Sequence, residues 1–322
     1  MKVLVIGIGS IGERHIRNLR TLGVEDLFVY DNKADVFRPD TGIPDLPPQV
    51  SKMQYIVQKY DAHYYQPNQL HEKMDAFVVC TPPAYHTEYV IEGLSHHIHV
   101  FVEKPISNSL QYLDWVESRS TANNLIVQVG YQMRFDPELA LLKHRLDKSK
   151  DILSIQAEYG QYLPSWHPND DYTKSYTAQS EAGGGIILDA SHEIDYVRWL
   201  AGSEVKSVSC MAKHASNLMI DVEDLAEITL QFENGVIGHI HLDMIQKEYV
   251  RRVTVIGNNS DETVTWKKQI PVLDPYVEEM RQFLDCVKTG SKPLVDAHEG
   301  IQVLRIALAA KQSAAEGRII EL

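Results

Sequence analysis

Residues 2–12 read KVLVIGIGSIG, a short β-branched and aliphatic run that passes directly into three spaced glycines, and a helical pattern follows. The pattern G-x-G-x-x-G is weak alone, but between a strand and a helix it is typical of dinucleotide binding. Gly7 would allow the tight turn, Gly9 would let the backbone approach a pyrophosphate, and Gly12 would let helix and strand pack closely. The helix N-terminus would then present its N–H groups to the phosphates. This stretch predicts an α/β Rossmann dinucleotide-binding domain.

The next strand, Leu27–Tyr30, ends at Asp31, about 20 residues after the glycines, where an acid takes the ribose hydroxyls. A carboxylate there repels the 2′-phosphate of NADP, so the predicted cofactor is NAD. Lys33 lies close enough in the sequence to keep NADP open as the less favoured alternative. Residues 38–50 contain four prolines and are predicted to form an extended loop before a helix at Lys52–Lys59.

Two further apolar runs end in residues suited to chemistry. Asp75–Cys80 stops at Thr81-Pro82-Pro83, and Val100–Val102 leads into Glu103-Lys104-Pro105. Alternating strands and helices predict right-handed βαβ units and a parallel sheet, and ligands bind outside the carboxyl ends of such strands. Taken alone, Lys104 fits a surface turn equally well. The nucleotide fingerprint beside it favours an active-site lysine.

From Leu153 the pattern changes to alternating, half-buried strands. Glu233-Asn234-Gly235 between two such strands predicts a hairpin with a type I′ turn. The expected second domain is α+β, with a large, mainly antiparallel sheet. The expected boundaries are 1–130 for the Rossmann domain and 131–322 for the substrate-binding and oligomerisation domain. The last helices, Pro275–Lys288 and Ala297–Glu316, read as scaffold that could pack back on the first domain.

Composition excludes several classes of function. The chain has 322 residues and a formal net charge of −13, which disfavours binding to a phosphate backbone, so no nucleic-acid partner is expected. No apolar run reaches the length of a membrane span, so no membrane partner is expected. Three scattered cysteines form no C-x-x-C pair, which argues against structural zinc or a disulfide framework, and no metal site is predicted. The N-terminus enters a strand directly, which predicts a cytoplasmic protein.

A second stretch with chemical potential, residues 183–200, reads GGGIILDASHEIDYVRWL. At 100° per residue, Asp189, His192, Tyr196 and Trp199 fall within one arc of a single predicted helix. Apolar residues cover much of the remaining circumference, so the helix should be mostly buried. A buried Asp and His must be hydrogen-bonded or face a wet cleft. A satisfied core histidine is the structural alternative to a catalytic one.

The segment 162–176 precedes this helix and interleaves aromatic residues with carboxylates and amides. Such a composition suits a hydroxyl-rich ligand, whose ring face stacks and whose edge hydrogen-bonds. Trp166, His167 and Tyr172 are therefore candidate substrate-binding residues. An ordinary ordered loop is the alternative.

The motifs together resemble those of the Gfo/Idh/MocA oxidoreductase family, named for glucose-fructose oxidoreductase and inositol dehydrogenase. The motifs that carry the resemblance are Gly7-x-Gly9-x-x-Gly12 with Arg14-His15, Thr81-Pro82-Pro83 with His86, and Glu103-Lys104-Pro105. The resemblance covers essentially the whole chain, and it implies that the lysine of the last motif, here Lys104, reaches both substrate and nicotinamide ribose. It also implies that the helical histidine is the acid/base and that the protein is a homodimer or homotetramer, here through the open sheet face. Many members separate the first acid and the histidine by four residues, whereas Asp189 and His192 are three apart, which leaves the role of Asp189 open. The 162–176 segment resembles a branch linked to bacterial surface-sugar synthesis.

The predicted function is hydride transfer between a nicotinamide and a hydroxyl or keto carbon of a sugar, sugar derivative or nucleotide sugar. The predicted catalytic residues are Lys104, His192 and Asp189. The predicted cofactor-binding residues are Gly7, Gly9, Ser10, Ile11, Gly12, Asp31, Thr81, Pro82, His86, Glu103 and Lys104. The predicted substrate-binding residues are Tyr131, Arg134, Trp166, His167, Tyr172, Asp189 and His192. The alternatives are a redox-neutral NAD-dependent glycosidase or epimerase, and an NAD-binding regulator without turnover.

Overall fold

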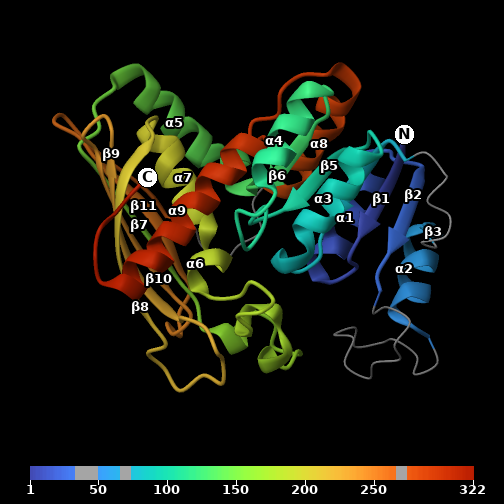
Figure 1. Ribbon diagram of the computed structural model, residues 1–322, viewed down its shortest axis with the longest axis horizontal. Helices are drawn as coiled ribbons and strands as arrows, with labels where there is room; N and C mark the ends of the chain where they lie inside the picture. The colour runs from blue at the N-terminus through green and yellow to red at the C-terminus, as the bar shows by residue number, and fades with distance from the viewer. Residues whose placement is uncertain (33–49, 66–73, 266–273) are drawn as a thin grey trace. The chain divides into compact units, whose positions relative to one another are not determined.

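The computed structural model describes residues 1–32, 50–65, 74–265 and 274–322 (Figure 1). Lys33 and the four prolines of the predicted loop lie outside these residues. The chain divides into two compact units. The first unit contains Met1–Ser107, Gln111–Gly130 and Tyr276–Gly300, and the second contains Asn108–Leu110, Tyr131–Pro275 and Ile301–Leu322.

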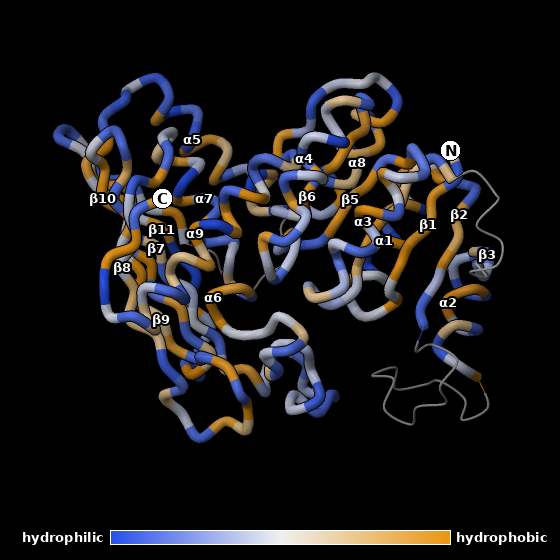
Figure 2. The backbone as a smooth tube through the Cα atoms, in the orientation of Figure 1, coloured by the Kyte–Doolittle hydropathy of each residue, from blue (hydrophilic) through white to orange (hydrophobic). Residues whose placement is uncertain are grey.

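The first unit is built on a parallel sheet with the strand order β3-β2-β1-β4-β5-β6. Its strands are β1 (Lys2–Ile6), β2 (Asp26–Tyr30), β3 (His63–Tyr64), β4 (Ala76–Val79), β5 (His99–Glu103) and β6 (Val127–Gly130). Central strands of this sheet are largely hydrophobic along their length (Figure 2), and β4 is buried at every residue. Strands covered on both faces read as continuous apolar runs, which confirms the predicted Rossmann-type α/β fold.

Helices connect and cover these strands, in the order α1 (Ser10–Thr21), α2 (Lys52–Tyr60), α3 (His86–Ser95) and α4 (Leu113–Ala122). Ser51 caps α2 with a capping box. Its side chain accepts a hydrogen bond from the Gln54 N–H, and the Gln54 side chain accepts one from the Ser51 N–H. Ile16 and Leu19 of α1 are fully buried in the same core cluster as Val5 and Val78. The amphipathic face of α1 therefore packs on the central strands.

One segment of the expected second domain, residues 131–322, lies in the first unit, as the expectation that the last helices could pack back on the first domain allows. The segment Tyr276–Gly300 belongs to the first unit, and it contains most of α8 (Pro275–Thr289) and the start of α9 (Ala297–Glu316). The reason is hydrophobic: Met280 and Phe283 are fully buried in the core cluster of the parallel sheet, and the Phe283 ring lies 5.7 Å from that of Phe101. At the start of α9, Asp296 caps the helix by accepting a hydrogen bond from the Glu299 N–H at 3.0 Å.

The second unit is built on a mixed sheet with the strand order β12-β11-β7-β10-β9-β8-β13. Its strands are β7 (Ser154–Gly160), β8 (Val205–Lys213), β9 (Leu225–Phe232), β10 (Ile237–Asp243), β11 (Val250–Ile256), β12 (Asp261–Thr265) and β13 (Ile320–Glu321). Only the β7–β10 pair is parallel among the paired strands described. The predicted mainly antiparallel sheet is confirmed.

The β9–β10 hairpin is present, but the predicted type I′ turn is wrong. That turn needs positive φ at both central residues, and among these residues only Gly235 has positive φ, at +88°. The Gly235 N–H donates to the Phe232 carbonyl, which makes Glu233 and Asn234 the central residues of the turn. Asn234 is held in this conformation because its amide donates to the Ala201 carbonyl and its Oδ1 accepts from Val236.

The helices of the second unit pack on one face of its sheet. They include α5 (Pro137–Ser149), α6 (Ile186–Asp189) and α7 (Ser191–Ala201), and the unit also contains α9 from Ile301 onward. The alternation of buried and exposed residues along β8, β9 and β10 leaves Met211 77% and Ile237 51% exposed. The proposed oligomer contact through this face stays a prediction. Within the described ranges, no helix combines the length and apolar character needed to cross a bilayer.

Candidate active site

The glycine loop of the first unit has the geometry that its spacing predicts. Gly7 has φ of +90°, and its N–H donates to the Tyr30 carbonyl at 2.8 Å. A Cβ on Gly12 would lie 1.9 Å from the Gly7 carbonyl oxygen, so only glycine lets α1 start this close to β1. A Cβ on Gly9 would meet no heavy atom of the described chain within 4 Å. Gly12 is therefore packed tightly against Gly7, and the space outside Gly9 is open.

The start of α1 suits a nucleotide phosphate. Its N-cap residue is Gly9, which brings no side chain to satisfy the first N–H groups, and both Gly9 and Ser10 are exposed while Ile11 is half-buried. Asp31, half-buried after β2, accepts a hydrogen bond from the Ile8 N–H at 3.0 Å. This bond places the acidic side chain against the glycine loop. The residues present therefore fit a dinucleotide, with N–H groups for phosphate and a carboxylate for ribose.

His86, predicted to bind the cofactor, is a buried link between two strand ends. Its Nδ1 lies 2.8 Å from the Pro105 carbonyl oxygen and its Nε2 lies 2.7 Å from the Thr81 carbonyl oxygen, with 1% of the residue exposed. Burial lowers the pKa of His86, and the two carbonyls oppose this effect. A neutral imidazole donates to one carbonyl only. The geometry favours a positioning role for His86 over direct contact with a cofactor, while Thr81 and Pro82 are half-buried at the end of β4.

Lys104 follows the last residue of β5 and is half-buried, whereas its neighbours Glu103 and Pro105 are buried. The Lys104–Pro105 peptide bond is cis. Glu103 accepts a hydrogen bond from His15 Nε2 at 2.6 Å and from the Lys104 N–H at 3.2 Å. Burial raises the pKa of the Glu103 carboxyl, but the hydrogen bond from His15, the charge of Lys104 and the hydrogen bond from its N–H together bring the pKa below its ordinary value.

In the second unit the predicted single helix is interrupted. The helix α6 ends at Asp189, Ala190 adopts φ −95° and ψ 30°, and α7 begins at Ser191. The prediction of one continuous arc was therefore wrong, and nothing in the local sequence explains the break at Ala190. The prediction of burial is confirmed, because Asp189 is 7% and His192 is 6% exposed.

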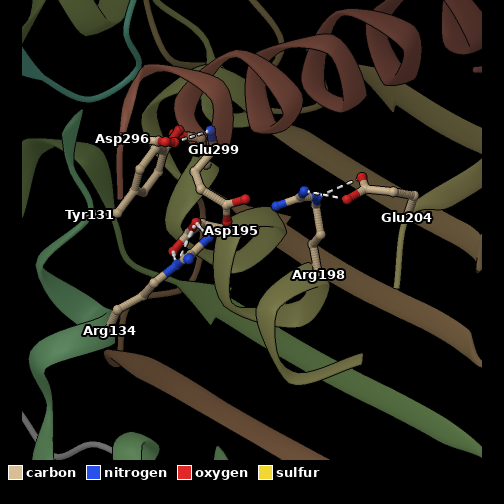
Figure 3. Close-up of polar contacts among 8 residues, drawn as sticks. Tyr131, Arg134, Asp195, Arg198, Glu204, Asp296 and Glu299 are labelled. Atoms are coloured by element: carbon tan, nitrogen blue, oxygen red, sulfur yellow. Dashed lines mark hydrogen bonds and ion pairs between the residues drawn. The ribbon is translucent and has the colours of Figure 1, made fainter. Parts of the chain in front are cut away.

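Tyr131 and Arg134 follow the first unit's last strand and contact α7. The Tyr131 ring lies 5.6 Å from the His192 ring at 88°, and its hydroxyl donates to Ser191 Oγ at 3.3 Å. Tyr131 therefore contacts the predicted acid/base. The Arg134 guanidinium binds the Asp195 carboxylate, with Nη2 2.6 Å from Oδ1 (Figure 3). Since Arg134 is 3% exposed, its geometry favours a structural role over substrate binding.

The predicted substrate loop places its residues in different surroundings. The Trp166 indole N–H donates to the Gln161 carbonyl at 3.0 Å, and its ring lies 6.2 Å from that of Tyr159. His167 is exposed. The Tyr172 hydroxyl accepts from the Met219 N–H at 3.3 Å. Trp166 thus joins an aromatic cluster of the sheet, whereas Tyr172 connects its loop to the segment before β9.

Sequence reasoning missed a buried ion pair beside His192. Arg251 of β11 donates to the fully buried Glu193 carboxylate at 2.7 Å, and its guanidinium lies 4.6 Å from the Tyr159 ring centroid. Burial alone would lower the pKa of Arg251, but the Glu193 carboxylate raises it above its ordinary value. The signal was a pair of arginines inside an alternating strand, at Arg251 and Arg252. Its partner lies 58 positions away in the sequence.

Comparison with known families accounts for nearly the whole chain. Residues 1–131 match the model described as "Oxidoreductase family, NAD-binding Rossmann fold" of GFO/IDH/MocA proteins. Residues 150–260 match the GFO/IDH/MocA C-terminal domain, and residues 258–322 match the C-terminal alpha/beta domain of the same oxidoreductase family.

Individual relatives are similar over their full length. The myo-inositol 2-dehydrogenase of Thermotoga maritima is 27% identical, over 100% of this chain and 98% of the relative. The structure of a scyllo-inositol dehydrogenase from Lactobacillus casei with bound NAD(H) and scyllo-inositol has a TM-score of 0.81 and 18% identity, over 100% of this chain and 98% of that one. The WlbA dehydrogenase from Bordetella pertussis, in complex with NADH and UDP-GlcNAcA, has a TM-score of 0.82 and 21% identity over the same shares.

Proposed function

We propose that this chain, which belongs to the Gfo/Idh/MocA family of NAD-binding oxidoreductases, moves a hydride between a nicotinamide cofactor and a CH–OH carbon of a cyclic polyol, sugar or nucleotide sugar. One observation carries the proposal. The glycine loop, Asp31, Thr81-Pro82 and Lys104 follow four neighbouring strands, β1, β2, β4 and β5, at the carboxyl edge of one parallel sheet. Lys104 would therefore lie at the same edge of the sheet as the proposed nucleotide site.

The proposed cofactor is NAD rather than NADP. The Asp31 carboxylate, held against the glycine loop by Ile8, would hydrogen-bond the ribose hydroxyls and repel a 2′-phosphate. Ser10, Ile11 and the three glycines would hold the pyrophosphate through main-chain N–H groups. A bound nicotinamide supplies or accepts the hydride.

The protein's own residues would manage the proton and the charge of the substrate hydroxyl. We assign His192 as the group that removes the hydroxyl proton during oxidation and returns it during reduction. Lys104 would donate a hydrogen bond to the same oxygen and stabilise its developing negative charge. Asp189, three residues before His192, would orient the imidazole and set its tautomer.

The proposed substrate class is a hydroxyl-rich ring. Trp166 and Tyr159 form an aromatic cluster in the second unit, with the Arg251 guanidinium over the Tyr159 ring, and the half-buried Trp166 would offer its ring to the substrate. Relatives named for inositols and a nucleotide-sugar dehydrogenase support the same class. Aromatic faces and a few placed polar groups are the usual lining of such sites.

The experiment is a substrate panel followed by the absorbance band of NADH. The purified chain is mixed with NAD⁺ or NADP⁺ and with myo-inositol, scyllo-inositol, simple hexoses and UDP-GlcNAcA. We expect NADH to form with at least one ring polyol or nucleotide sugar, and faster with NAD⁺ than with NADP⁺. Consumption of a substrate without net NADH would instead indicate the redox-neutral alternative. No conversion with any ring substrate, despite NADH binding, would sink the proposal in favour of a regulator.

A further inference from the structure

Both oxygens of the Glu103 carboxylate, immediately before Lys104, accept hydrogen bonds. Glu103 Oε1 accepts a hydrogen bond from His15 Nε2 at 2.6 Å, and Oε2 accepts one from the main-chain N–H of Lys104 at 3.2 Å. Glu103 is 7% exposed. On the adjacent strand β6, a Cβ on Gly130 would come within 3.1 Å of Oε2. The main chain of Gly130 therefore closes one side of the carboxylate and limits the ways it can turn.

His15 comes from the helix that begins at the glycine loop. It lies on α1, one turn after Gly12, and it is fully buried. Its ring packs 5.0 Å from the Phe101 ring of β5 and 6.1 Å from the Tyr276 ring, in edge contacts with both. Aromatic neighbours on two sides leave the imidazole in one orientation, with Nε2 directed at Glu103.

The hydrogen bond between His15 and Glu103 joins two parts of the predicted nucleotide site. One end is the helix whose N-terminal N–H groups would hold the pyrophosphate, and the other end is the residue peptide-bonded to Lys104. The two residues are 88 positions apart in the sequence. Any shift of α1 relative to the end of β5 must stretch a 2.6 Å charge-assisted hydrogen bond, which is short and directional.

We propose that His15 and Glu103 are positioning residues, which hold the Lys104 side chain in a fixed position relative to the part of the cofactor that α1 binds. The inference rests on the proposed function, because it takes the ligand of the glycine loop to be a nicotinamide dinucleotide. It replaces the cofactor contact that the sequence predicts for Glu103 with a role that acts through Lys104, and it adds His15 to the site. The rival role is stabilisation of the fold alone.

Two nucleotides separate these roles without any need for a substrate. ADP-ribose occupies the glycine loop and Asp31 but carries no nicotinamide, whereas NADH extends to the region that Lys104 serves. A residue that only stabilises the fold changes both affinities alike. A residue that positions Lys104 changes the affinity for NADH and spares that for ADP-ribose. The Lys104→Ala variant gives the reference ratio.

The variants are matched at one position. His15→Leu removes the donor and fills the same part of the core with an apolar side chain. His15→Gln places an amide nitrogen near the former Nε2 position and restores a donor to Glu103. Asn18→Ala is the control, because Asn18 is buried one turn further along α1 and, in the part of the chain that the structure describes, it makes no hydrogen bond to Glu103. Binding is measured by isothermal titration calorimetry with NADH and with ADP-ribose.

We expect His15→Leu to weaken NADH binding at least tenfold and ADP-ribose binding less than twofold, as in Lys104→Ala. His15→Gln should recover NADH binding to within threefold of the unmodified protein, and Asn18→Ala should leave the ratio unchanged. Equal weakening of both ligands, no weakening of either, or a Gln variant as poor as Leu would overturn the inference.

A second variant keeps the test decisive if His15→Leu fails to fold. His15→Asn carries an amide too short to reach Glu103, so it should behave as Leu does, whereas His15→Gln should not. Similar NADH affinities for Asn and Gln would overturn the inference. Failure of the unmodified protein to bind NADH at all would overturn the proposed function instead, and the two failures are therefore distinct.

Discussion

The first unit prepares its predicted site mainly through the backbone, and the second prepares its own through side chains. In the first, Gly7, Gly9 and Gly12 leave main-chain groups and open space at the start of α1. In the second, α7 lies among buried ion pairs, Arg134 with Asp195 and Arg251 with Glu193. A site of main-chain groups tolerates change at most side chains. A site of paired charges depends on each partner being present.

The largest expected effect comes from the two proposed catalytic side chains. His192→Ala should lower kcat about 10³-fold, because general acid/base groups contribute roughly 10²–10⁴. Lys104→Ala should lower kcat to a similar extent. The measurement is steady-state turnover with the best substrate of the panel. Turnover within threefold of the unmodified protein in both variants would refute the assignment.

The NADH affinity of the same two variants tests the comparison between the units. His192→Ala should leave NADH affinity nearly unchanged, because His192 belongs to the second unit, whereas the glycine loop and Asp31 belong to the first. Lys104→Ala should reduce it. If the His192 variant lost NADH affinity as Lys104→Ala does, the division of roles between main-chain and side-chain sites would fail.

The next effect tests whether the ion pairs of α7 are structural. Asp195→Ala leaves the Arg134 guanidinium buried without its carboxylate, and breaking such a pair costs about 3–5 kcal/mol of the free energy of unfolding. Arg145→Ala is the comparison, because the side chains of Arg145 and its partner Glu262 are 51% and 27% exposed, and a pair open to water contributes about 0–1 kcal/mol. Urea denaturation followed by circular dichroism measures both.

The double variant Arg134→Met with Asp195→Leu is the control for this experiment. Replacing both partners by apolar residues is often close to neutral. A double variant as unstable as Asp195→Ala would mean that shape, rather than the unpaired charge, causes the loss.

The glycine loop offers a smaller effect with two distinguishable outcomes. Gly12→Ala forces a Cβ within 1.9 Å of the Gly7 carbonyl, so it should destabilise the protein by about 1–3 kcal/mol, as overpacking does. Gly9→Ala meets nothing in the described chain, so its stability should change by less than about 0.5 kcal/mol. Gly9→Ala should nonetheless weaken NADH binding about tenfold, because its methyl group would occupy the space left for the pyrophosphate. Thermal melts and NADH titration separate the two, and equal stability losses would contradict the packing argument.

The contrast also explains what the sequence could predict. The constraint on Gly12 comes from Gly7, five residues earlier, so spacing alone revealed it. The pairs His15–Glu103 and Arg251–Glu193 join residues 88 and 58 positions apart, and no local pattern encodes such distances. His86 looked like a ligand because its position after β4 is visible in the sequence, whereas the two carbonyls around its ring are not. The hairpin failed for a similar reason, because Asn234 is held by the distant Ala201 carbonyl.

The smallest expected effect is a pH dependence in the sheet of the second unit. His241 lies between two carboxylates, with Nδ1 2.6 Å from Glu227 and Nε2 3.0 Å from Asp243. The hydrogen bond to Asp243 is the largest effect on the pKa of His241 and raises it. Burial opposes this effect, and the hydrogen bond to Glu227 adds to it, so the pKa rises from 6.5 to about 9. The folded protein thus holds this proton more tightly than the unfolded chain does.

The sign of the pH dependence follows from that difference. The contribution of His241 to stability is fully present below about pH 6.5 and is lost as the pH rises through about 9. After allowance for solvent screening, we expect a loss of about 1–2 kcal/mol over this interval. Chemical denaturation at pH 6, 7.5 and 9.5 measures it, with His241→Gln as the control that should flatten the profile. If the stability of His241→Gln fell with pH as steeply as that of the unmodified protein, other groups would cause the pH dependence. His241 and its two carboxylates would then not be an example of a paired-charge cluster in the second unit.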